Sequence, residues 1–131
     1  MLQIKRRFLG DGVTVIQMEG NVDISNCFRV NDVINEVVEA GGRRLVLNLE
    51  LVGFVDSSCL GALLRGLELV HQESGAMVLV GNAFVDKVLT LTGLTHLLVS
   101  YPDEDSAVQA LKSGKDPVGE RRAPRRSPGR P

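Results

Sequence analysis

The chain has 131 residues and is 44% hydrophobic, which is enough for one domain with its own core but too short for two. The formal net charge of −1 is unevenly divided, because residues 113–131 carry six Lys or Arg against two Asp or Glu (+4), which leaves −5 for residues 1–112. An acidic main part argues against a domain that binds nucleic acid directly, and no apolar run approaches the roughly 18 residues of a membrane span.

Two cysteines, Cys27 and Cys59, are too few for a disulfide framework and lack the spacing of a metal site. They fit a reducing compartment. His71 and His96 have no carboxylate or cysteine at ligand spacing either. We therefore expect a cytoplasmic protein without a membrane segment, metal or cofactor, as a monomer or weak dimer.

The N-terminal third predicts a hairpin followed by a helix. The apolar-rich runs Leu2–Leu9 and Val13–Glu19 flank three turn-forming residues, Gly10-Asp11-Gly12, as in a β-hairpin. Ser25 is then expected to cap a helix that ends at Gly41-Gly42. The apolar stripe of this helix consists of Val30, Val33, Ile34, Val37 and Val38.

Strands and helices alternate along the rest of the chain. Leu45–Leu49 and Ala76–Val80 are unbroken apolar runs, typical of strands buried on both faces. The other expected elements are a helix from about Ser58 to Ser74-Gly75, a helix capped by Asn82 and running through Leu91, a strand at Leu97–Tyr101 and a helix opened by Pro102-Asp103. This order predicts an α/β fold with right-handed crossovers, in which four helices accompany a mixed, mostly parallel sheet of about five strands.

The apolar pattern stops after Lys112, so we expect one domain over residues 1–112. Four of the five prolines fall in residues 113–131, together with three glycines and five arginines. A segment of this composition cannot offset its ordering entropy by burial, which predicts a disordered basic tail.

The stretch Val52–Gly61 joins the buried strand to the second helix. Asp56, Ser57 and Ser58 are residue types that cap helices, and they stand where the loop must turn into that helix. A helix N-terminus has unpaired N–H groups and partial positive charge, so it can hold a phosphate. The stretch therefore predicts either a phosphorylation switch at one of the serines or two ordinary helix caps.

Over residues 2–112 the sequence resembles the STAS domain, and more closely the bacterial anti-sigma-factor antagonists. The resemblance is carried by two motifs, Gly20-Asn21-Val22-Asp23 and Asp56-Ser57-Ser58-Cys59-Leu60-Gly61. It implies that Ser57 is the phosphoacceptor, with Ser58 as the second choice. It also implies that the neighbours of the phosphosite are Asp23, Asp56, Cys59 and Gly61. Without such a role, Asp23 is a turn residue near Ser25.

Two positions depart from the family pattern. Cys59 stands where a small glycine is usual, and Asn48-Leu49-Glu50 stands where Asp-Leu-Ser is more common. The first departure could alter the fit to a partner, and the second leaves the end of the strand unlike the family's. Neither removes the acceptor hydroxyl.

The resemblance implies a function in protein binding. The unphosphorylated chain would sequester an anti-sigma serine kinase with a histidine-kinase-like ATPase fold and so release a sigma factor, and a serine phosphatase would reverse the modification. A phosphate adds about −1.5 to −2 charges, so docking over an acidic patch that already contains Asp56 and Asp23 should fail. The partner-binding surface is expected opposite the leucines of the second helix, at Gly61, Arg65, Glu68 and Gln72. The alternative for these four residues is an ordinary solvated face.

Other functions stay open at this point. The chain could be a STAS subunit of a larger signalling or lipid-transport assembly, or a module that binds an anion or nucleotide at the helix N-terminus. An enzyme is disfavoured, because Ser57 lacks a Gly-x-Ser-x-Gly context and neither glycine-rich nucleotide motif occurs.

Overall fold

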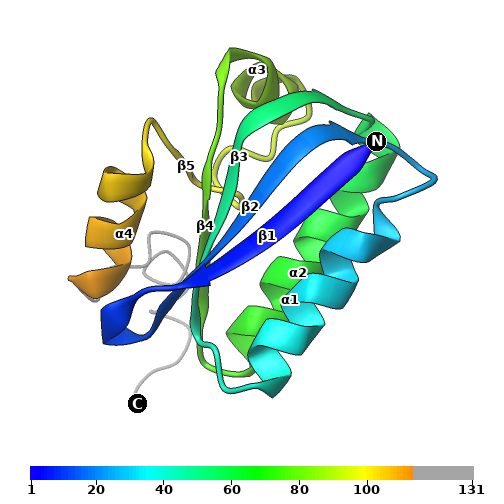
Figure 1. The fold of residues 1–131 in the computed structure, drawn as a ribbon. Coiled ribbons are helices and arrows are strands. Elements are labelled where there is room, and N and C mark those ends of the chain that lie inside the picture. The colour runs from blue at the N-terminus through cyan, green and yellow to red at the C-terminus, as the bar shows by residue number, and fades with distance from the viewer. Residues whose placement is uncertain (114–131) are drawn as a thin grey trace.

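A five-stranded sheet in the order β1-β2-β3-β4-β5 forms the centre of the computed structural model, which describes residues 1–113 (Figure 1). Its strands are β1 (Leu2–Phe8), β2 (Val13–Val22), β3 (Arg44–Val55), β4 (Ala76–Val80) and β5 (Ser100–Tyr101). β1 pairs antiparallel with β2 as the predicted hairpin, and every later pair is parallel. The predicted α/β fold with a mixed, mostly parallel sheet and four helices is confirmed.

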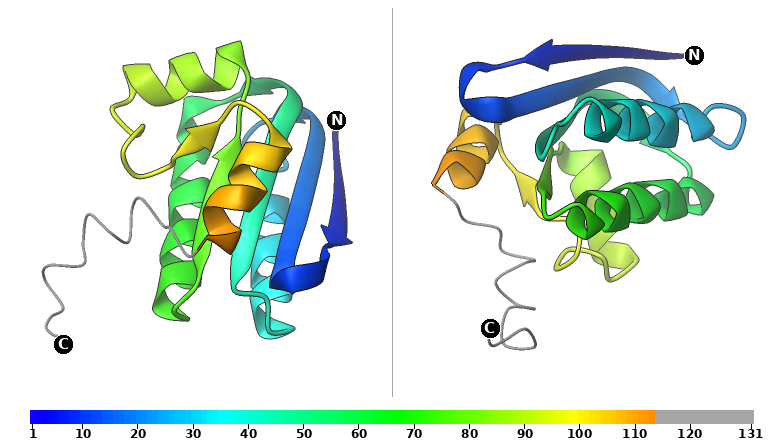
Figure 2. Two further views of the ribbon diagram at one scale, coloured as in Figure 1. Left: turned by 90° about the vertical axis from the view of Figure 1, so that its left-hand side faces the viewer. Right: turned by 90° about the horizontal axis from the view of Figure 1, so that it is seen from below.

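The helices are α1 (Phe28–Glu39), α2 (Leu60–Gln72), α3 (Ala83–Leu91) and α4 (Glu104–Lys112). α1 and α2 lie side by side on one face of the sheet, α4 covers the other face, and α3 lies across the end to which the parallel strands run (Figures 1 and 2). Alternate residues of β3 serve the two faces. Leu45 and Leu47 belong to the core under α1 and α2, whereas Val46 belongs to the core under α4. None of these helices has the length and apolar character needed to cross a membrane.

α1 and α2 approach each other closely because Gly66 of α2 has no side chain. A Cβ atom at this position would come within 2.5 Å of Cδ1 of Ile34 in α1. One turn earlier on α2, the Ala62 carbonyl accepts a hydrogen bond of 2.8 Å from the Asn31 side chain. These contacts fix the start of α2 relative to α1.

The largest departure from the predicted elements is the length of β3. The sequence predicts a strand at Leu45–Leu49 followed by a loop, but β3 continues to Val55. The extension pairs with the end of β2, with register shifts that place Leu51 opposite Glu19 and Val55 opposite Val22. Such bulges keep a strand paired while they bend it, so the apparent loop residues remain part of the sheet.

Three predicted boundaries are also wrong. α1 begins at Phe28 and Ser25 does not cap it, because residues 24–27 form a separate turn before the helix. A 3-10 turn over Ser57–Cys59 precedes α2. The last strand comprises only Ser100–Tyr101. The predicted disordered tail lies outside the described residues, apart from Ser113.

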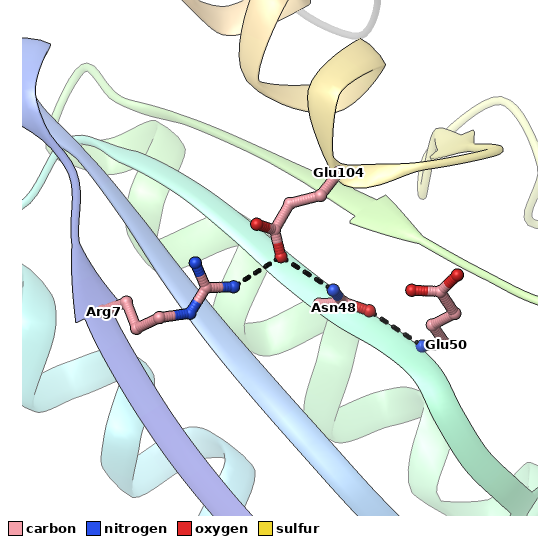
Figure 3. A network of polar contacts seen from close by, with 4 residues as sticks. All are labelled: Arg7, Asn48, Glu50 and Glu104. Atoms are coloured by element: carbon pink, nitrogen blue, oxygen red, sulfur yellow. Dashed lines mark hydrogen bonds and ion pairs between the residues drawn. The ribbon is translucent and has the colours of Figure 1, made fainter.

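On the α4 face, a polar network joins three distant elements (Figure 3). Asn48 of β3 is buried, and its Nδ2 donates a hydrogen bond of 2.8 Å to Oε2 of Glu104 in α4. Arg7 of β1 pairs with the same oxygen at 2.6 Å, and Oδ1 of Asn48 accepts from the backbone N–H of Glu50. An aspartate at position 48 would face the Glu104 carboxylate without a proton to donate, so this contact depends on the amide group of Asn48.

We expect Glu104→Gln to lower the free energy of unfolding by about 1 kcal/mol at neutral pH. The expected loss is this small because the contact between Glu104 and Arg7 is partly exposed, and water screens the attraction between their charges. Burial by itself raises the pKa of Glu104, but hydrogen bonds from Arg7 and Asn48 outweigh it and hold this pKa below the ordinary 4.5. Because the pKa of Glu104 is lower in the folded chain than in the unfolded chain, its ionised form stabilises the fold at pH values above the ordinary pKa. This stabilisation is lost as the pH falls through the lowered pKa.

Urea unfolding across this pH range tests the network. The difference in free energy of unfolding between the parent and Glu104→Gln should shrink in acid. Asp105→Asn is the matched change at an exposed position of the same helix, and its free energy of unfolding should follow that of the parent at each pH. Equal effects of the two substitutions would contradict the network's contribution.

Candidate functional site

The end of the sheet to which β2 and β3 run brings the two sequence motifs together. Val22 and Val55 are partners in the parallel pairing of these strands, and the N–H of Asp56 donates a hydrogen bond of 2.9 Å to the Val22 carbonyl. Asp23 and Asp56 each follow one of these paired valines directly. The Gly-x-x-Asp segment and the serine loop are therefore neighbours, although more than 30 residues separate them in sequence.

One carboxylate holds the turn that carries the two serines. Oδ1 of Asp56 accepts hydrogen bonds of 3.0 Å from both the backbone N–H and the hydroxyl of Ser58. The Asp56 carbonyl accepts from the N–H of Cys59 at 2.8 Å, which closes the 3-10 turn. The first serine is different: Ser57 is exposed, and no group among residues 1–113 forms a hydrogen bond with its hydroxyl. Of the two serines predicted as phosphoacceptors, only Ser57 has a hydroxyl that is both exposed and without a hydrogen bond to another group in residues 1–113.

Three N–H groups just before and at the start of α2 already have hydrogen-bond acceptors within the turn. The amide of Ser58 is bound by the Asp56 side chain, that of Cys59 by the Asp56 carbonyl and that of Leu60 by the Ser57 carbonyl. In the unmodified chain these three amides are therefore occupied, and the expectation that the start of the helix holds a phosphate stays a prediction. A phosphate on Ser57 would remain on the surface next to the Asp56 carboxylate.

Asp23 has the turn role that the sequence leaves as an alternative. Its Oδ1 accepts hydrogen bonds from the backbone N–H and the hydroxyl of Ser25, and its carbonyl accepts from the N–H groups of Asn26 and Cys27. The bonds from Ser25 hold the pKa of Asp23 below its ordinary value of 3.8, so this carboxylate is negatively charged at neutral pH. A role of Asp23 towards Ser57 stays a prediction.

Two thiols meet below the serine loop, a contact that sequence reasoning missed. Cys27 directly precedes α1 and Cys59 directly precedes α2, and the packing of the two helices places the Cys27 side chain beside that of Cys59. Cys59 is only 1% exposed, and Cys27 is half-buried against the same core. Burial, reinforced by the Cys27 thiol, raises the pKa of Cys59 to about 11. Cys59 therefore fills a place in the core as a neutral thiol.

The predicted partner surface on α2 is one continuous helical face. Arg65, Glu68 and Gln72 are exposed, and Gly61 is half-buried. The Arg65 side chain reaches back over Gly61, where an added Cβ would lie 3.4 Å from Nη1. The guanidinium group thus lies towards the N-terminus of α2, on the side of the serine loop.

The described part of the chain holds no cluster of three or more His, Cys, Asp or Glu that could bind a metal ion.

This fold is similar to that of SpoIIAA from Bacillus, whose phosphorylated form superimposes with a TM-score of 0.64 at 20% identity. The structure of unphosphorylated SpoIIAA superimposes with a TM-score of 0.65 at 18% identity, covering 84% of this chain and 98% of SpoIIAA. The chain belongs to the STAS domain family, whose family model matches residues 9–107.

Two relatives are closer in sequence. An anti-sigma F factor antagonist of Paenibacillus polymyxa is 28% identical over 103 residues, which cover 77% of this chain and 88% of that protein. The crystal structure of an anti-sigma factor antagonist from Mycobacterium paratuberculosis is also 28% identical. It superimposes with a TM-score of 0.73 over 86% of this chain and 95% of that chain.

We expect iodoacetamide to modify Cys27 well before Cys59 at neutral pH, because only a thiolate reacts and the Cys59 pKa of about 11 leaves almost none. In urea the pKa of Cys59 returns towards 9.0, and the two thiols should react at similar rates. The unfolded thiol ionises first, so stability should also fall as the pH rises above 9.0. Peptide mass mapping of the labelled sites measures both rates, and fast native labelling of Cys59 would contradict the buried contact.

Proposed function

We propose that this chain is an anti-sigma factor antagonist switched by phosphorylation of Ser57. The unmodified form binds an anti-sigma factor and so releases a sigma factor, and the modified form does not bind. The observation that carries this proposal is the Ser57 hydroxyl, which is exposed and unbonded at the start of α2 while Asp56 holds its neighbour Ser58. The names of the two closer relatives support the same function.

The local electrostatics explain how one phosphate ends binding. It adds about −1.5 to −2 charges next to the Asp56 carboxylate. The amides of Ser58, Cys59 and Leu60 already have acceptors and are not free to bind the dianion, which therefore faces whatever docks there. A partner that covers the loop must desolvate this charge, which is costly without a matching cation.

The fold itself has no reason to change on modification. The Ser57 hydroxyl makes no bond to any other group in residues 1–113, so its substitution by a phosphate ester breaks none of the contacts there. SpoIIAA, which shares the fold, has been solved in both unphosphorylated and phosphorylated forms. The switch therefore acts on recognition and leaves folding unaffected.

The partners follow from this mechanism. The anti-sigma factor is a serine kinase of the histidine-kinase-like ATPase type, and a serine phosphatase restores the hydroxyl. The docking surface combines the serine loop with the exposed face of α2, formed by Gly61, Arg65, Glu68 and Gln72. The chain acts in the cytoplasm as a binding protein without catalytic activity of its own, in keeping with relatives that are named as regulatory antagonists.

We expect incubation with the cognate anti-sigma kinase and ATP to place a single phosphate on Ser57, located by mass spectrometry. Ser57→Ala should bind the kinase as tightly as the parent and stay bound in the presence of ATP. Ser57→Asp should bind at least about tenfold more weakly, because it sets a second carboxylate beside Asp56. Isothermal titration calorimetry measures each dissociation constant.

Ser58→Ala is the matched control, since it removes a hydroxyl from the same turn that is already bound to Asp56. It should still accept phosphate at Ser57. If mass spectrometry locates the phosphate on Ser58 of the parent, or if Ser57→Asp binds the kinase as tightly as the parent, the proposed switch is wrong.

A further inference from the structure

The carboxyl-terminal part of β3 extends beyond its neighbour β4. β4 ends at Val80, which pairs with Asn48, so residues 49–55 of β3 have a strand partner only on the β2 side. This part of the strand bends over the end of the sheet towards α2, with α3 beside it (Figure 1). An exposed ribbon of this kind needs support from other parts of the chain.

Asn82 supplies that support. Its Nδ2 lies 3.2, 3.1 and 2.8 Å from the carbonyl oxygens of Leu49, Glu50 and Val52. Its Oδ1 accepts a hydrogen bond of 2.8 Å from the N–H of Val85 and so caps α3. One side chain thereby joins the ribbon to the start of α3 and holds both in a fixed relation.

The ribbon and the start of α3 carry three exposed large apolar side chains, which we call the apolar ridge: Leu51, Phe54 and Phe84. They are 52%, 44% and 38% exposed. The rings of Phe54 and Phe84 pack against each other with centroids 5.9 Å apart, so the ridge joins β3 to α3. Large apolar side chains gathered on a rigid support are typical of protein-binding sites.

The ridge borders the proposed switch. Phe54 is three residues before Ser57 on a ribbon that runs directly into the serine loop. Across the loop, on the β2 side, Ile24 is a further exposed apolar residue. Glu50 lies on the ribbon itself and Asp56 at its end, while Lys87 follows Phe84 by one turn of α3, so the charges that border the apolar surface are two acidic groups and one basic group.

We propose that the apolar ridge is a second docking point for the anti-sigma partner that Ser57 controls, an inference that rests on the proposed function. The partner face that fits it carries aliphatic side chains with Lys or Arg at the rim, opposite Glu50 and Asp56. The same acidic groups disfavour the other occupants. A symmetric contact between two copies would bring like charges together, and an anionic lipid surface would be repelled.

The ridge and the switch make separable contributions. The ridge contributes apolar contact that is present whether or not Ser57 is modified, whereas the phosphate adds repulsion. Loss of the ridge should therefore weaken binding of the unmodified chain without abolishing phosphorylation-dependent release.

The test is a calorimetric titration of full-length variants with the purified, cognate anti-sigma serine kinase. We expect Phe84→Ser to raise the dissociation constant at least about tenfold, as for a large residue within a docking site. The matched control is Leu91→Ser at the opposite end of α3, where the side chain is 76% exposed and away from the ridge; it should bind like the parent. Leu51→Ser, on the strand, repeats the test without touching α3, and thermal melting confirms that each variant is folded.

The outcomes separate the ridge from the switch. If Phe84→Ser and Leu51→Ser both bind like the parent while Ser57→Asp still weakens binding, the ridge proposal is wrong and the proposed function stands. If the parent itself does not bind the kinase, both fail. If sedimentation shows a dimer of the parent that Phe84→Ser dissolves, the ridge is a contact between copies and the proposed occupant is wrong.

Discussion

The parallel pairing of Val22 with Val55, closed by the hydrogen bond from the Asp56 N–H to the Val22 carbonyl, is the contact on which the site depends. It continues the β2–β3 ladder to the last residue of both strands. The two segments that leave the sheet there, one beginning with Asp23 and the other with Asp56, must start side by side. One end of the molecule therefore carries the carboxylates of Asp23 and Asp56, the exposed hydroxyl of Ser57 and the exposed apolar side chains. The paired ends of β2 and β3 hold these groups in place.

Asp56 makes two adjacent serines structurally different, because it binds the side chain of Ser58 and not that of Ser57. Because its carboxylate binds both the amide and the hydroxyl of Ser58, the turn is closed without any contribution from the Ser57 side chain. The first of these bonds also occupies the Ser58 amide, which would otherwise be available to an anion. A phosphate on Ser57, as proposed, would therefore find the Ser58 amide already bonded and would add its charge beside the Asp56 carboxylate, where it can act on a partner.

Locally encoded features could be predicted and contacts between distant segments could not. The hairpin at Gly10-Asp11-Gly12 and the cap of α3 by Asn82 depend on turn and capping residues that act within a few positions, and both are present. The extension of β3 was missed because Gly53 reads as a turn residue, whereas the pairing that keeps it in a strand comes from β2. The contact between Cys27 and Cys59 likewise depends on how α1 packs on α2, which neither local sequence reveals.

With Ser57 as the proposed phosphoacceptor, its position also decides how the modification would act. A modified residue changes stability only when its side chain takes part in the contacts that define the fold, and the Ser57 hydroxyl takes part in none of those described. Modification of Ser57 would therefore leave the relative free energies of the folded and unfolded chain nearly unchanged. Its effect falls on the free energy of association, where a desolvated dianion beside Asp56 opposes a surface that is otherwise suited to binding. If the apolar ridge binds the partner as proposed, its contacts would persist in both states, and the affinity of the modified form would be set by the balance between these contacts and the repulsion from the phosphate.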